Sequence, residues 1–107
     1  MFLNRPELRE AGGGVWETTG PLVFSSLTAE APPGICVPEG FQTDFGFIPP
    51  PARGWIVPSS AATGPAVIYA WLRSVGFPRG TAMAVFQEAL EANEVPRDRR
   101  SLFLLSL

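Results

Sequence analysis

The prolines of this chain are the feature that most limits how it can fold. There are 12 of them among 107 residues, together with 11 glycines. Because proline fixes φ and lacks a backbone N–H, it interrupts helices and the interiors of sheets. This content favours turns and extended segments over a plain helical bundle. A chain of this length fits one domain with a single core.

The first half of the chain predicts short strands. Residues 15–18 and 21–26 are rich in β-branched and aromatic side chains. Thr19-Gly20 separates them, which predicts a hairpin. Residues 35–37 continue in extended structure, and residues 41–45 alternate between apolar and polar side chains as a strand does.

Two segments are expected to lack regular structure. Residues 1–14 end in three consecutive glycines, and we expect them to be a flexible N-terminal arm. Residues 46–62 contain three consecutive prolines and are expected to form a long surface loop. The predicted single domain therefore covers residues 15–107.

The last third predicts helices. Apolar residues recur at helical spacing from Pro65, which suits a first turn. A second helix opens at Pro78 or Thr81 and turns Glu88 away from its apolar face, and a third follows Pro96. We therefore expect an α+β fold, with a small antiparallel sheet of three to four strands in the N-terminal half and two to three packed helices in the C-terminal half.

Several kinds of catalytic and metal-binding side chain are absent from the sequence. There is no histidine, and the eight basic residues are all arginines. The absence of lysine excludes Schiff-base and P-loop lysines. The absence of histidine excludes the usual general base and the commonest metal ligand. Cys36 is the only cysteine, so no internal disulfide or cysteine zinc cluster forms, and its apolar neighbours predict that it is buried. We expect no enzymatic activity, metal or cofactor.

The charge and hydropathy of the chain bear on its partners. The net charge of −2 argues against nucleic acid, which requires a basic surface. No segment approaches the ~20 apolar residues that span a bilayer, so no membrane partner is expected.

One segment carries a specific motif. Residues 37–49 read V-P-E-G-F-Q-T-D-F-G-F-I-P. This resembles a motif of small phage and prophage proteins, the family called domain of unknown function 1353, whose members read roughly V-P-x-G-F-x-T-D-F-A-S-I-P-R. Residues 66–72 and 78–90 resemble the two helical blocks that follow in the family. Order and spacing match from about Val15 to the C-terminus.

The departures from the family pattern fall on polar positions. The family's His-Asp pair is Tyr69-Ala70 here, and the Asp of its last block is Met83. Its Ser and Arg in the first block are Phe47 and Pro50. The resemblance implies a metal or acid–base site in a typical member. With these replacements, this chain is not expected to use the same chemistry.

The candidate residual polar site consists of Thr43, Asp44, Tyr69 and Arg79. Asp44 is either a carboxylate at the mouth of a pocket facing the helix of Tyr69, or a turn residue that accepts backbone N–H bonds. The turn role is favoured, because a lone carboxylate rarely supports catalysis. Arg79 is hypothesised to pair with Asp44. Tyr69 is expected to fill the vacated polar position, with its hydroxyl on Asp44 or on water.

Apolar residues in the loop and at the C-terminus predict a contact surface. Residues 101–107 are apolar on every side, which indicates either complete burial or, the favoured alternative, a partner surface. A tryptophan in the loop would anchor an interface. The candidate interface residues are Trp55, Ile56, Leu102, Phe103, Leu104, Leu105 and Leu107.

Three functions are consistent with these observations. The first is a structural or interaction protein of a bacteriophage or phage-like particle, at the capsid surface, neck or tail. Its partners would be other phage structural proteins or further copies of itself, and it would be made in the host cytoplasm and located in the virion. The alternatives are a cell-wall-directed hydrolase with a rearranged site around Asp44, and a host-directed inhibitor that acts by binding.

Overall fold

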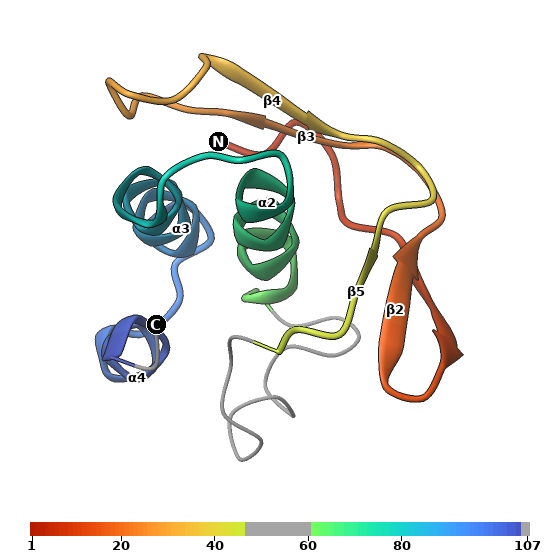
Figure 1. The fold of residues 1–107 in the computed structure, drawn as a ribbon. Helices are drawn as coiled ribbons and strands as arrows, with labels where there is room; N and C mark the ends of the chain where they lie inside the picture. The colour runs from red at the N-terminus through yellow and green to blue at the C-terminus, as the bar shows by residue number, and fades with distance from the viewer. Residues whose placement is uncertain (47–60, 106–107) are drawn as a thin grey trace.

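The structure is a computed structural model that describes residues 1–46 and 61–105. Strands occupy the first part of the chain and helices the second (Figure 1). The predicted α+β fold is therefore confirmed, with antiparallel pairing in the N-terminal half and helices in the C-terminal half. The strands form two small sheets rather than the one that was predicted. Most of the predicted loop, residues 47–60, lies outside the described residues.

The first sheet contains β1 (Leu8–Gly12), β2 (Val15–Thr18) and β5 (Gln42–Thr43), with β2 in the centre. Both pairings are antiparallel. The three glycines Gly12, Gly13 and Gly14 have φ values of 98°, 62° and 81°, a conformation that glycine adopts without steric cost. Gly12 ends β1, and Gly13 and Gly14 form the turn that leads to β2. The prediction of a flexible arm over residues 1–14 is therefore wrong, because β1 lies within it and pairs with β2.

The second sheet pairs β3 (Leu22–Ser25) with β4 (Gly34–Val37), again antiparallel. The predicted hairpin between residues 15–18 and 21–26 is wrong, because β2 and β3 belong to different sheets. The physical reason is that β1 and β5 already occupy both edges of β2. The chain therefore turns at Thr19-Gly20 into a new sheet.

The first residues of the chain run along β3. Phe2 forms an antiparallel bridge with Phe24. The Leu3 amide donates to the Val23 carbonyl at 3.0 Å, and the Ser25 amide donates to the Met1 carbonyl at 2.8 Å. These bonds place residues 1–3 on the opposite side of β3 from β4, as a third, very short strand.

The Phe2 side chain points into the molecule. Its ring centroid lies 4.6 Å from that of Phe24. The ring also reaches the first turn of α2, where a Cβ on Gly64 would lie 3.0 Å from the ring. A larger residue at that position would displace Phe2, so the glycine allows the N-terminal segment to pack on the helix.

The helices are α2 (Thr63–Ser74), α3 (Arg79–Ala92) and α4 (Arg97–Leu105). Their prolines lie where the sequence predicted: Pro65 in the first turn of α2, Pro78 immediately before α3 and Pro96 immediately before α4. Gly76 has a φ of 100° and ends α2, as its left-handed backbone stops the helical ladder.

The core lies between the second sheet and the helices α2 and α3. Helix α2 is buried along its first turns, and α2 and α3 lie side by side on the same side of the β3–β4 sheet (Figure 1). The largest fully buried side chains are Phe24, Phe45, Phe86, Leu22, Ile68, Leu72, Leu90, Val37 and Val67. Among the residues that the structure describes, no helix is long and apolar enough to cross a membrane.

The side chains of β4 alternate between the core and the surface. Ile35 and Val37 are buried, whereas Cys36 is exposed. The prediction that Cys36 is buried is therefore wrong. Apolar sequence neighbours are a poor guide in a strand, because successive side chains point to opposite faces of the sheet.

Candidate functional site

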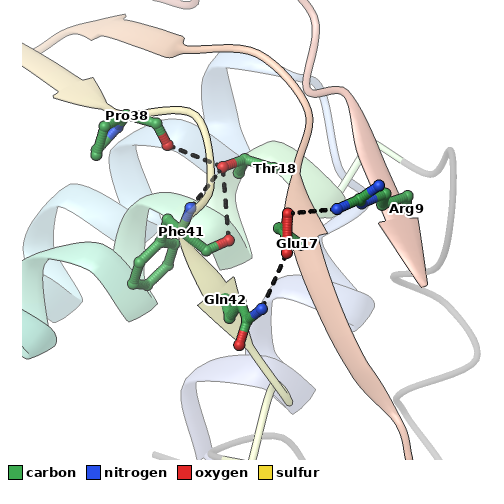
Figure 2. A network of polar contacts seen from close by, with 6 residues as sticks. All are labelled: Arg9, Glu17, Thr18, Pro38, Phe41 and Gln42. Atoms are coloured by element: carbon green, nitrogen blue, oxygen red, sulfur yellow. Dashed lines mark hydrogen bonds and ion pairs between the residues drawn. The ribbon is translucent and has the colours of Figure 1, made fainter. Parts of the chain in front are cut away.

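The family-like motif begins as a turn that is fastened to β2 by Thr18 (Figure 2). The Thr18 hydroxyl donates to the Pro38 carbonyl at 2.8 Å and accepts from the Phe41 amide at 2.9 Å. The Thr18 backbone also bonds the turn, through its carbonyl to the Gly40 amide and through its amide to the Phe41 carbonyl. Gly40 has a φ of 88°, which explains the glycine of the motif. Thr18 is 2% exposed, so these bonds are shielded from water.

The neighbouring residue, Glu17, lies on the outer side of the same corner. Its carboxylate accepts from Gln42 Nε2 and from Arg9 Nη2, each at 2.9 Å (Figure 2). The hydrogen bond from Gln42, followed by that from Arg9, lowers the pKa of Glu17 below its ordinary value. The carboxylate thus joins all three strands of the first sheet from the central strand outward.

The second half of the motif borders an open hollow of about 360 Å³ between β5 and α2. The hollow is lined by Val15, Phe41, Gln42, Thr43, Asp44, Ala70 and Ser74. Phe41 fixes the strand against the helix, since its ring packs edge-on to that of Trp71 with centroids 5.3 Å apart. Thr43 and Asp44 line the hollow together with Ala70 and Ser74 of α2.

Thr43 and Asp44 are both engaged in local backbone bonds. The Thr43 hydroxyl accepts from the Phe45 amide at 3.1 Å, and Asp44 Oδ1 accepts from the Gly46 amide at 2.8 Å. The latter is the turn role that the sequence favours for this aspartate. Phe45 is buried with a φ of 53°, so the two bonds hold a left-handed residue in the core.

The other two members of the predicted polar site lie elsewhere. Tyr69 is 5% exposed and packs on Phe86 of α3, with ring centroids 5.5 Å apart. It is Ala70, the next residue, that lines the hollow with Asp44. Arg79 is exposed at the start of α3. The ion pairs recorded among the described residues join Arg9 to Glu17 and Arg100 to Glu91, so the hypothesised pair of Asp44 with Arg79 is not formed.

The chemistry of the hollow follows from these positions. Among the described residues that line it, Asp44 is the ionisable one, and the hydroxyl of Ser74 donates to the Trp71 carbonyl within the helix. The lining residues therefore present one carboxylate beside two locally bonded hydroxyls. In the described ranges, no three histidine, cysteine, aspartate or glutamate side chains gather as they would around a metal ion.

A family model describes most of this chain. The model called protein of unknown function (DUF1353) matches residues 16–106. The chain belongs to this family. The match includes the motif of residues 37–49 and all three helices. It confirms the resemblance to this family that the sequence shows. No curated protein and no solved structure matches the chain.

Within this DUF1353 chain, the structure separates Tyr69 from Ala70, the two positions at which the resemblance implied a His-Asp pair. Tyr69 points into the core towards α3, and Ala70 faces the hollow. The Tyr69 ring packs against the Phe86 ring of α3. The methyl group of Ala70 leaves space in front of Asp44. Both sides of the hollow are mixed: Ala70 and Ser74 line it from the helix, and Phe41 and Asp44 are among the residues that line it from the motif.

A second polar cluster was missed by the sequence analysis. Glu88 of α3 accepts bonds from the Ser26 hydroxyl at 2.7 Å, the Leu27 amide at 2.7 Å and the Thr28 hydroxyl at 2.9 Å. Glu88 was predicted to point away from the apolar face, but it is half-buried against the loop that follows β3. The sequence feature that could have indicated this contact is the pair of hydroxyl residues, Ser26 and Thr28, on either side of Leu27.

The predicted interface residues cannot all be placed. Trp55, Ile56 and Leu107 lie outside the described residues. Leu102, Phe103, Leu104 and Leu105 form the end of α4, as predicted for the third helix, although only their backbone is described. The described part of the chain instead draws attention to a different apolar surface. Its exposed apolar side chains include Met1, Leu3 and Leu27.

Proposed function

We propose that this protein is a structural or interaction protein of a bacteriophage or phage-like particle, and that it acts through protein–protein contacts on the outer face of the β3–β4 sheet. The observation that carries the proposal is the apolar character of that face. An antiparallel sheet packed on a core normally presents polar side chains to water on its other side. Here the outward side chains of residues 1–3, β3 and β4 include Met1, Leu3, Val23 and Cys36, with Ser25 as a polar member at the end of β3.

The alternation of the strands defines this surface. Phe2, Leu22, Phe24, Ile35 and Val37 point into the core. The residues between them point outward, and Met1 and Leu3 are 71% and 65% exposed. Contiguous apolar side chains of this kind are typical of a surface that meets another protein.

Leu27 extends the surface beyond the end of β3. Its side chain is 93% exposed. Its backbone is nevertheless fixed, because the Leu27 amide donates to Glu88 and the residues on both sides of it bond the same carboxylate. A side chain presented from a fixed backbone loses little conformational freedom on binding, which favours its use as a contact.

The phage setting is supported by the resemblance of the motif to small phage and prophage proteins. Within the particle, the proposal covers a position at the capsid surface, the neck or the tail. Asp44 Oδ1 accepts a hydrogen bond from the Gly46 amide in a local turn. This favours a structural role for the polar residues of the motif. We therefore propose binding rather than catalysis as the activity of this chain.

The test is quantitative mass spectrometry of purified, nuclease-treated particles from the phage or prophage that encodes the protein. A fixed number of copies per particle is expected. Leu27→Ser should lower that number while leaving the soluble protein folded. Val75→Ser is the matched control, because Val75 is 48% exposed but lies at the end of α2, away from this face. Absence of the wild-type protein from the particles would overturn the proposal.

A further inference from the structure

The outer strand of the second sheet has an unoccupied edge. Among the described residues, β4 pairs with β3 on one side and with no strand on the other. Figure 1 shows no described strand or helix beside β4 on its other side. The edge of a sheet presents a row of backbone donors and acceptors that can pair with another strand.

The hydrogen bonds of β3 show which residues of β4 form this edge. Val23 and Ser25 direct their backbone groups towards residues 1–4. Leu22 and Phe24 therefore direct theirs towards β4, where they face Val37 and Ile35.

The intervening residue of β4, Cys36, consequently points its N–H and C=O away from β3. Within the described part of the chain, neither group has a recorded hydrogen-bond partner. By the same alternation Gly34, which faces Ser25, also directs its backbone groups to this edge. Cys36 thus presents a free donor and acceptor in the middle of the strand, with Gly34 beside it.

The composition of β4 leaves this edge open to pairing. The strand reads Gly34-Ile35-Cys36-Val37 and carries no charge. Proteins commonly protect an edge with lysine, proline or a bulge within the strand. Here the prolines lie outside it, at Pro33 and Pro38, so a partner strand has to be short.

We propose that β4 pairs with β4 of a second copy of this chain, antiparallel and centred on Cys36, to form a continuous sheet across a two-fold axis. Antiparallel pairing centred on Cys36 obeys two-fold symmetry, since each Cys36 amide then donates to the other Cys36 carbonyl. The side chains of Gly34 and Cys36 are small, which allows close approach. The proposal rests on the proposed interaction role and names one partner for it.

This pairing brings the two apolar outer faces side by side. Residues 1–3, β3 and β4 of each copy would form one sheet, and the apolar surface would double in extent. Because the paired stretch is short, the dimer is expected to be weak, with a dissociation constant in the micromolar range or above.

The first test is the oligomeric state of the purified full chain under reducing conditions, measured by sedimentation velocity over a wide concentration range. Wild type is expected to shift reversibly from monomer to dimer as concentration rises. Cys36→Arg places two like charges against each other at the axis and should leave a monomer. Leu27→Arg, which adds the same charge to an exposed residue off the edge, should still dimerise. Circular dichroism melting checks that each variant is folded.

The second test uses the single cysteine as a reporter. Residues facing each other in a hydrogen-bonded antiparallel pair have Cα atoms about 5.5 Å apart, within the range for a disulfide. Mild oxidation should therefore link wild-type chains at least about tenfold faster than the double variant Cys36→Ser, Leu27→Cys, because only the edge pairing holds two cysteines together.

Two results would overturn the dimer. They are a wild type that stays monomeric at every concentration, and a Cys36 that links no faster than Cys at position 27. Because these measurements use purified protein, their failure is distinct from absence of the protein from particles.

Discussion

Two polar side chains hold turns against the rest of the molecule, and they do so in different ways. Thr18 bonds the turn of the family motif through a buried, neutral hydroxyl. Glu88 bonds the loop after β3 through a half-buried carboxylate that accepts three hydrogen bonds. The first joins a turn to a neighbouring strand, and the second joins a loop to a helix 60 or more residues away in the chain.

Because one contact is neutral and the other is charged, the two should respond differently to mutation and to pH. A neutral hydroxyl keeps its bonds at any ordinary pH, and its value depends on how dry the site is. A carboxylate accepts hydrogen bonds most strongly while it is ionised, and protonation weakens them. The two sites therefore predict different losses on mutation and different responses to acid.

The largest effect is expected from Thr18→Val, which keeps the shape of the side chain but removes the hydroxyl. The Pro38 carbonyl and the Phe41 amide would lose a buried partner, and the free energy of unfolding should fall by about 2–3 kcal/mol. Urea denaturation followed by circular dichroism measures this. Thr18→Ser is the control and should lose less. An unchanged stability of Thr18→Val would show that water replaces the hydroxyl.

A smaller loss is expected from Glu88→Gln. The amide retains an oxygen acceptor but loses the charge that strengthens three bonds, so the free energy of unfolding should fall by about 1 kcal/mol. Partial exposure of the carboxylate keeps the loss modest. Glu94→Gln, an exposed substitution near the end of the same helix, is the matched control and should be neutral. Equal effects of the two variants would contradict a specific role for Glu88.

Acid should then separate the two sites. Partial burial acts to raise the pKa of Glu88, but the bonds from Leu27, Ser26 and Thr28, with the charge of the Met1 amino group, lower it below its ordinary 4.5. The folded chain thus binds fewer protons at Glu88 than the unfolded chain. This contribution to stability is complete above pH 4.5 and is lost as the pH falls through the folded pKa.

Urea unfolding midpoints between pH 7 and pH 3 test this expectation. The urea concentration at the midpoint should decrease for wild type as the pH is lowered below 4.5. For Glu88→Gln the decrease should be smaller. Thr18→Val should give a curve parallel to that of wild type, at lower stability. If Glu88→Gln instead ran parallel to wild type, other carboxylates would account for the acid response.

The fold was more predictable from sequence than the site. The helices were predicted because proline marks each beginning and apolar residues follow at helical spacing. The strand pairing was not, because the sequence shows that residues 15–18 are extended but not that β1 and β5 already occupy both edges of β2. The three consecutive glycines led to the prediction of a flexible arm, whereas they lie at the end of β1 and in the turn that follows it. Long-range pairing decides such cases, and local composition does not contain it.

At the site, the local contacts were predictable and the distant ones were not. Asp44 bonds the amide two residues further on, a pattern that is visible in sequence. Whether Tyr69 or Ala70 faces Asp44 depends on the rotation of α2 against β5, which the apolar periodicity of the helix does not specify. Glu88 was missed for the same reason, because its partners lie on a loop whose position depends on the sheet.

The smallest effect is expected from Glu17→Gln, although Glu17 is next to Thr18 and also joins strands. Arg9, its ionic partner, is 67% exposed, and an exposed ion pair is screened by water and salt. The melting temperature should change less than in Glu88→Gln, and the change should disappear in high salt. A loss as large as that of Thr18→Val would mean that the charge of Glu17 stabilises this corner as much as the buried hydroxyl does, although the Glu17 side chain is 18% exposed and Thr18 is 2% exposed.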